Sequence, residues 1–525
     1  MMLFKRSLLF VVSFLMVGSP CFGQEKKDKS DYVHRSEYED LLKKFEALQQ
    51  RLEQLEADRA TRAGGEETRP GAHEAQAGDS GTEAEAAKAQ GRAQEPAAEK
   101  PSATAGLHLP DVASFTPGFE RAEERRLAEP NKVPAMNARI AHVGEMDLYM
   151  GFDSVGRFQY LTQDNVAVKG DVPDRLEPGF QTPFGDLSFM ANFGDALDIY
   201  FDIHIATRPN PDHLQGDQGY LLVHKMPERL QGFRPLDWFF EEFDLKAGAF
   251  EIDYGDAHNR RSNNAQVQQN PLIGNYVVDP RATDIGLELI SAGRRVKWLL
   301  GFGSGTYEGH FENGGGYSAH GKVWGDPIKD LRTSFSMYYS DHSGDGVGWP
   351  GSGTVGNLFR TNRSGGPYQG VLDDGDAPGQ VMPGMGQKVT AVQADLTWRL
   401  RPIELYAYFA YMQDADINGS GPGAPEDSWY YYAGEGIYYF TNRLYLAARY
   451  SGATARRLND ASSNGMVHRI QLGGGYWFFD SVLAKLEFVY QKYRDFSETD
   501  GMISGVDAWL DPEFKGVIAE ASFGF

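Results

Sequence analysis

The 525-residue sequence is almost free of cysteine, and it contains no apolar run long enough to cross a membrane as a helix. Its one cysteine, Cys21, lies in an N-terminal segment that we expect to be removed. The mature chain would then have no thiolate metal ligand, no cysteine nucleophile and no disulfide. HExxH, CxxCH and Gly-x-Ser-x-Gly motifs are also missing, so we expect neither an enzyme nor a bound cofactor.

Basic residues are in deficit as well. The formal net charge of -22 argues against a nucleic-acid-binding protein, because nothing would offset repulsion by the phosphates. A mean hydropathy of -0.47 is too polar for a helical membrane protein. Aromatic residues make up 13% of the chain and there are 61 glycines, which suits membrane interfaces and tightly packed strands.

The N-terminus has the pattern of a secretory signal peptide. Lys5 and Arg6 precede a short apolar run over 8–17, and small residues follow near Gly23. We therefore predict a signal peptide over residues 1–23. A lipoprotein anchored at Cys21 is the alternative, but Pro20 is unfavourable at that cleavage site.

Residues 31–59 show a heptad pattern. Apolar residues recur at spacings of three and four, and Arg59 continues the pattern: Tyr38, Leu41, Phe45, Leu48, Leu52 and Leu55. Such a short helix is marginal alone, so we predict a periplasmic coiled coil, with a lone amphipathic helix as the alternative. Residues 60–138 are rich in Ala, Glu, Gly, Gln and Pro, and we predict a disordered linker there.

The chain from 139 to 525 alternates apolar and polar residues. Over 197–205 every odd-numbered residue is apolar, whereas Asp198, Asp202 and His204 point to the opposite face. The last ten residues alternate in the same way and end with Phe523, Gly524 and Phe525. This ending resembles the assembly signal of bacterial outer-membrane barrels, and the resemblance implies recognition by the barrel assembly machinery.

The alternating segments number sixteen, and their connections mostly alternate between short and long. The predicted strands are 145–160, 186–193, 196–206, 217–226, 242–251, 284–291, 295–303, 318–324, 331–340, 388–399, 402–412, 429–440, 443–451, 467–478, 482–493 and 515–525. Short turns on one side and long loops on the other predict an all-β transmembrane barrel of about sixteen antiparallel strands. The connection 227–241 is too long for this scheme and suggests a miscounted strand. The segment 341–387 is the longest predicted outer loop, and we expect its tip to face solvent.

Aromatic clusters near the predicted strand ends are typical of interfacial girdles. They lie at 238–240, 429–432, 438–440 and 477–479.

One short acidic segment matches the first half of a calcium-binding loop. Asp414, Asp416 and Asn418 have the spacing of its first three ligands. A solvated acidic turn is the alternative.

The loop 252–283 is the candidate functional segment. It is long and polar, and its charged residues suggest a pore constriction: Asp256, His258, Arg260, Arg261 and Arg281. With its flanking strands it resembles the phosphate-selective porin O/P family, in which a long third loop folds into the pore. The resemblance implies an outer-membrane porin. The proline usual after the Gly-x-Phe strand end is replaced by Ile252, Asp253 and Tyr254.

We therefore predict a homotrimeric porin in the bacterial outer membrane that passes small hydrophilic solutes. Arg260 and Arg261 would favour anions, and the family resemblance implies phosphate among them. Its partners would be outer-membrane lipid and a second and third copy of the chain, and not nucleic acid. One alternative is a barrel that sheathes a multihaem cytochrome in an electron conduit, which would need an open lumen. A barrel enzyme is a further alternative, for which the sequence provides no clustered catalytic groups.

Overall fold

The computed structural model describes residues 116–525, except for 135, 137, 166–175, 207–213, 227–231, 233, 292–295, 305–316, 342–357, 360–366, 374–378, 382–385, 418–425, 459, 497–501, 504–505 and 508–510. The predicted signal peptide and coiled coil lie outside these residues. Within them, no helix is both long and apolar enough to span a bilayer.

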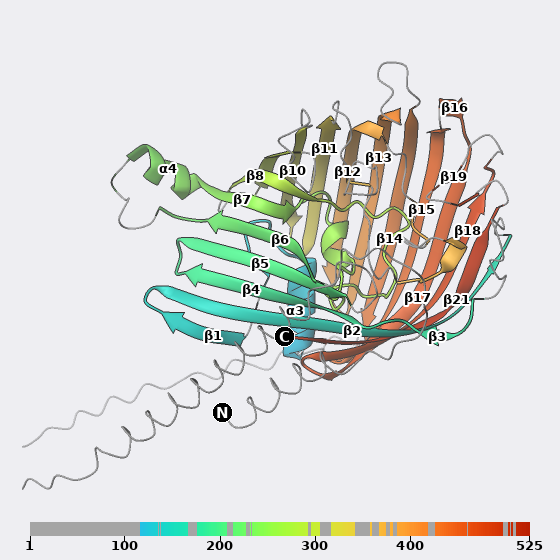
Figure 1. The fold of residues 1–525 in the computed structure, drawn as a ribbon, viewed down its shortest axis with the longest axis horizontal. Coiled ribbons are helices and arrows are strands. Elements are labelled where there is room, and N and C mark those ends of the chain that lie inside the picture. The colour runs from blue at the N-terminus through green and yellow to red at the C-terminus, as the bar shows by residue number, and fades with distance from the viewer. Residues whose placement is uncertain are drawn as a thin grey trace, which may run out of the picture. The chain divides into compact units, whose positions relative to one another are not determined.

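Sixteen antiparallel strands close into a barrel (Figure 1), which confirms the predicted fold class. Each strand pairs with the next in the ring, and β2 closes the ring by pairing with β21 from Asp153↔Gly524 to Asp164↔Glu513. In ring order the strands are β2 (Met146–Asp164), β4 (Phe184–Phe193), β5 (Leu197–Ala206), β6 (Leu214–Val223), β7 (Phe243–Glu251), β8 (Thr283–Ser291), β9 (Val296–Gly303), β10 (Tyr317–Ile328), β11 (Leu331–Asp341), β12 (Gly386–Leu400), β13 (Ile403–Ile417), β14 (Asp427–Tyr439), β15 (Leu444–Leu458), β17 (Met466–Phe479), β18 (Val482–Arg494) and β21 (Glu513–Gly524).

Several shorter elements accompany the barrel. They are helices α3 (Pro117–Arg126) and α4 (Arg234–Glu242), 3-10 turns η2 (Ala257–Arg260) and η3 (Val371–Asp373), and strands β1 (Ala138–Val143), β3 (Gly179–Phe180), β16 (Ala461–Ser462), β19 (Met502–Ile503) and β20 (Val506–Asp507). Strand β1 pairs with residues 146–150 at the beginning of β2, which precede the part of β2 that pairs with β21.

The two faces of the barrel wall differ in polarity as the alternation predicts. On β5, Ile199 and Phe201 point outward and are 37% and 46% exposed, whereas Asp202 and His204 are buried on the inner face. On β21, Phe523 points outward and is 38% exposed, and Glu520 is buried inside. An apolar outer face and a polar inner face are typical of a barrel whose outer surface contacts lipid.

The connections at the barrel end that contains the beginning of β2 are short turns, with one exception. The exception is the connection between β6 and β7. The sequence suggested a miscounted strand there, but the segment contains helix α4 instead. The cluster at 238–240 therefore lies on this helix and not at a strand end. The girdle interpretation suits Phe440, Phe478 and Phe479, which are exposed, but Trp429 and Trp477 point inward and are buried.

The predicted linker 60–138 is partly wrong. Its last part contains helix α3, and β1 begins at Ala138. Thr116 caps this helix by accepting a hydrogen bond from the amide of Phe119, and Pro117 occupies its first turn. The composition of the segment obscured a short helix that is stabilised by contacts with the barrel.

The closure of the barrel generates a prediction about Phe525. Its amide donates to the carbonyl of Phe152 and its carbonyl accepts from the amide of Phe152, at 3.2 and 3.3 Å. Deleting Phe525 should lower the yield of folded, membrane-inserted protein, because both bonds at the seam and the terminal aromatic ring are lost. Heat-modifiable mobility of membrane fractions measures this yield. The control Phe409→Ala removes a lipid-facing ring that is 57% exposed and should fold almost normally; equal yields for both variants would contradict the assembly role.

Helix α4 generates a second prediction. Trp238 is 60% exposed, and its ring lies 6.3 Å from that of Phe243, which lies 5.5 Å from Trp298 on the outer wall. Aromatic rings next to a lipid-facing wall favour the membrane interface. The fluorescence of Trp238 is obtained as the difference between the wild-type protein and the Trp238→Phe variant. Brominated lipids should quench this difference. Quenching of that difference by aqueous iodide alone would instead place α4 in water.

Candidate functional site

Loop 252–283 crosses the lumen and contacts strands around most of the ring (Figure 1). On one side, the amides of Ala265 and Gln266 donate to Asp186 of β4 at 2.6 and 3.2 Å. On another, the amides of Ile273 and Gly274 donate to Glu487 of β18 at 2.6 and 3.0 Å. Only β2 and β21 separate β4 from β18 in the ring, but the loop also reaches β11, β13 and β14 on the far side. It therefore spans the lumen.

Arg260 anchors the loop to the wall opposite β4. Its guanidinium lies 2.6 Å from Glu404 of β13 and 2.6 Å from Glu435 of β14, and it stacks over the ring of Tyr406 at 4.7 Å. The side chain is 0% exposed. The expectation that Arg260 offers an unpaired positive charge to solutes is therefore wrong, because two carboxylates already neutralise it.

Arg261 and Arg281 are paired within the lumen too. Arg261 lies 2.7 Å from Asp279 of the same loop, and Arg281 lies 2.6 Å from Asp217 of β6. Both also approach Glu251, at the end of β7, at 3.6 and 3.5 Å. These contacts fix the conformation of the loop at the point where it returns to β8.

Asp256 and His258 lie at the beginning of the loop. Asp256 is 2.9 Å from Lys322 of β10 and 3.2 Å from Arg332 of β11. Burial alone would raise the pKa of Asp256, but these two cations more than offset burial and hold the pKa well below its ordinary value. The ion pairs of Asp256 therefore stabilise the folded protein fully at pH values above the ordinary carboxyl pKa. This stabilisation is lost progressively as pH falls from there through the lower pKa of the folded state. His258 contacts Asp253 at 3.3 Å.

A second segment packs on the loop and forms an apolar core inside the barrel. Leu358, Phe359, Tyr368 and Val371 are buried against loop and wall side chains. The amide of Val381 donates to the carbonyl of Val277 at 2.8 Å. These parts of segment 341–387 therefore lie inside the barrel. The tip, which we expect to face solvent, lies outside the described residues.

Sequence reasoning missed the strand residues that receive the loop. Glu404, Glu435, Arg449 and Glu487 are buried at inward-facing positions of β13, β14, β15 and β18. Arg449 lies 2.5 Å from Glu435 and donates to the carbonyl of Gly274 at 2.7 Å. The signal was available, because each residue is a charge at an inward position of an alternating strand, but register alone does not show which charges meet.

The calcium interpretation of 414–418 stays a prediction, although the strand that carries its first two residues does not favour it. Asp414 and Asp416 belong to strand β13, and an extended strand does not wrap its ligands around an ion. Asp414 is buried and lies opposite Asp427 of β14, and Asn418 lies outside the described residues. No cluster of metal-ligating side chains occurs among the residues that the structure describes.

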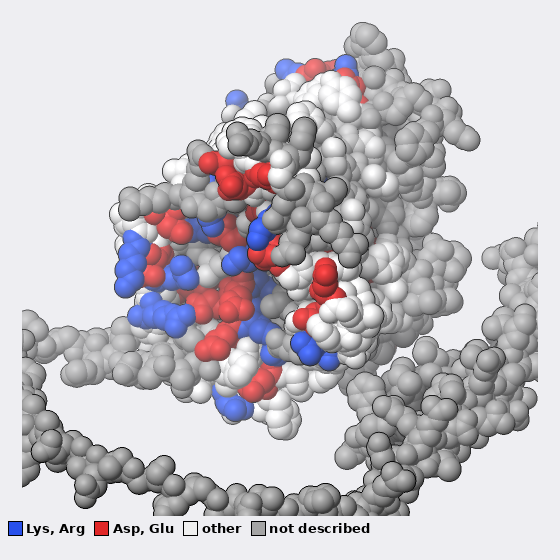
Figure 2. Space-filling view, turned by 90° about the vertical axis from the view of Figure 1, so that its left-hand side faces the viewer, with Lys and Arg blue, Asp and Glu red and all other residues white. Residues whose placement is uncertain are grey.

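The charges on one face of the barrel are mixed, not segregated. Figure 2 shows Lys and Arg next to Asp and Glu over the side that faces left in Figure 1. Among the buried side chains of the described residues, Asp and Glu outnumber Lys and Arg.

These features define a porin-like transmembrane barrel of sixteen strands, an architecture of bacterial outer-membrane proteins. No protein family matches the sequence, and no curated protein matches it.

Among solved structures, the chain is similar to OmpT, an outer membrane protein of Vibrio cholerae, to the outer membrane channel DcaP of Acinetobacter baumannii and to an anion-selective porin from Comamonas acidovorans. The TM-scores are 0.47, 0.47 and 0.46, with sequence identities of 10%, 13% and 9%. The matches cover 74%, 74% and 73% of this chain and 100% of each other chain.

The anchor at Arg260 generates a prediction about stability. Arg260→Met leaves Glu404 without its closest partner in a buried site, and breaking a buried pair in this way costs about 3–5 kcal/mol. The Arg260→Met barrel should therefore unfold at a lower temperature than the wild-type barrel, as measured by its heat-modifiable mobility. Adding Glu404→Gln to Arg260→Met removes one charge of each sign and should recover part of the loss.

The matched control is Arg457→Met. Arg457 pairs with Glu426 at 2.5 Å but is 47% exposed, so its loss should cost less than about 1 kcal/mol. Equal effects at Arg260 and Arg457 would show that the lumen pairs do not anchor the loop.

Proposed function

We propose that the protein is an outer-membrane porin for small hydrophilic solutes, and that loop 252–283 with its five predicted residues forms the constriction. The observation that carries the proposal is the loop itself, which crosses a closed barrel and is bonded to strands around its ring. A barrel of this width without such a loop would leave a broad aqueous channel.

The arginines are proposed as anchors that set the width of the constriction, not as free sites for anions. Phosphate selectivity, which the resemblance to the O/P family implies, is the narrower version of the proposal. The excess of buried acid makes it the less favoured version. We also propose a homotrimer, motivated by the heptads of residues 31–59.

The geometry favours this function over the cytochrome sheath. A sheath needs a lumen wide enough to hold its partner. Loop 252–283 and the segment around Tyr368 occupy the lumen with a packed core. Removal of loop 252–283 should therefore widen the channel.

The test is single-channel recording of purified protein in planar bilayers. Glu251 and Thr283 are paired across β7 and β8, so a four-residue Gly/Asn turn can replace residues 252–282 without moving either strand. Wild-type protein should show a small conductance, and the shortened protein should conduct several-fold more, because open area limits ion flow.

The control shortens the connection 418–425 between β13 and β14 to a similar turn, and it should leave the conductance nearly unchanged. Reversal potentials in a KCl gradient, and then in a phosphate gradient, test selectivity. An inserted, folded barrel that fails to conduct with and without the loop would exclude the porin function.

A further inference from the structure

The N-terminal segment 116–136 crosses the mouth of the barrel at the end with the short turns. Helix α3 packs against β14, β15 and β17, and the chain that follows it reaches β7, β9, β10 and β11. These two groups of strands lie on opposite sides of the ring. The segment therefore spans the mouth before the chain enters β1.

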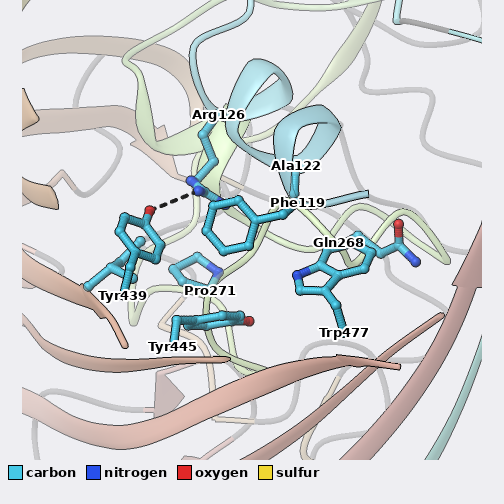
Figure 3. A pocket seen from close by; sticks show the side chains of 9 residues that line it. Phe119, Ala122, Arg126, Gln268, Pro271, Tyr439, Tyr445 and Trp477 are labelled. Atoms are coloured by element: carbon cyan, nitrogen blue, oxygen red, sulfur yellow. Dashed lines mark hydrogen bonds between the residues drawn. The ribbon is translucent and has the colours of Figure 1, made fainter. Parts of the chain in front are cut away.

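Phe119 docks the helix in an aromatic cradle (Figure 3). Its ring lies 4.9 Å from that of Tyr439 and 6.3 Å from that of Tyr445, and Trp477 lies on the other side. Phe119 is 2% exposed and Ala122 is 4% exposed, so one face of the helix is removed from water. Burial of this face supplies the apolar contribution to docking.

Arg126 adds a charged contact to the apolar one. Its guanidinium lies 3.5 Å from Glu404 and donates to the hydroxyl of Tyr439 at 3.1 Å and to the carbonyl of Gln269 at 3.4 Å. Helix α3 thus contacts both the wall and loop 252–283. Glu404 is shared between Arg126 of the helix and Arg260 of the loop.

The second half of the segment is held by polar contacts. Glu129 accepts from the indole of Trp324 at 2.7 Å and lies 3.0 Å from Lys297. Asn131 donates to Asp244 at 2.6 Å. Each contact joins the segment to a different strand, so the segment is secured at both sides of the mouth.

The docking has features of a removable element. A helix of ten residues is not stable alone, so it must be held by its cradle. Few apolar side chains of the helix are buried, so little apolar contact is lost when it leaves.

We propose that segment 116–136 is a plug that closes the short-turn mouth of the barrel, and that its undocking opens the channel and removes the positive charge of Arg126 from it. The proposal rests on the proposed porin function. It adds a second barrier in series with loop 252–283.

Gly118 offers a way to displace the plug without touching a lumen charge. A Cβ atom at this position would overlap the carbonyl of Asp480 and stand 2.7 Å from the ring of Trp477. Gly118→Val should therefore force the helix out of its cradle while the barrel wall stays intact. The control Glu120→Ala changes an exposed position of the same helix and should leave the plug in place.

Undocking is measured by thiol labelling, independently of conduction. In a Cys21→Ser background, Ala122→Cys should react slowly with a bulky maleimide, because residue 122 is buried. Adding Gly118→Val should raise the labelling rate at least tenfold. An unchanged rate in folded barrels would overturn the plug.

Opening is measured by single-channel recording of the same proteins. Gly118→Val should raise conductance at least about twofold, and Arg126→Gln should shift the reversal potential toward cations, because Glu404 and Glu435 then face fewer positive charges. A helix that undocks in the labelling assay without any change in conductance would overturn the gating role. If the barrel with the shortened loop 252–283 conducts in that case, only the plug is rejected. If neither that barrel nor the Gly118→Val variant conducts, the porin function is wrong as well.

Discussion

The buried contact of Arg260 with Glu404 and Glu435 is the interaction on which the interior of this barrel depends. A charged side chain without water is costly unless it is paired, so each of these groups requires the others in place. The loop that carries Arg260 is therefore fixed across the lumen. Arg449 extends the same network to a third strand and to the loop backbone at Gly274.

The network is possible because the wall of the barrel supplies charge at alternate positions. A strand residue that faces away from lipid has no apolar environment to fill, and in this chain many such positions carry Asp, Glu, Lys or Arg. These charges bind the backbone of loop 252–283 as well as its side chains: Glu487 accepts two of its amides, and Lys485 donates to three of its carbonyls. A loop without regular secondary structure thereby satisfies its backbone groups inside the protein.

Two of the elements inside the barrel, loop 252–283 and helix α3, are coupled through Glu404. Loop 252–283 contacts this carboxylate through Arg260, and helix α3 contacts it through Arg126. A change in one element alters the electrostatic environment of the other. The same few side chains therefore hold both elements in place inside the barrel.

Sequence alone determined the barrel, because the period of two is a local property that every strand repeats. All sixteen predicted strands occur, and one face of each is apolar and exposed on the outside, as Ile199 and Phe201 are on β5. Local pattern also indicated that loop 252–283 is a candidate functional segment, because it is long and carries several charged residues.

Only the tertiary structure decided what the loop charges do. Arg260 in a polar loop has the same local sequence whether it is exposed to solutes or paired with Glu435, which lies 175 residues away along the chain. Helix α3 was hidden for a similar reason, since its ten residues are stabilised by Tyr439, Tyr445 and Trp477 from distant strands. A period along the chain reveals which face of a strand a residue occupies, but the closure of the ring decides which residues meet inside it.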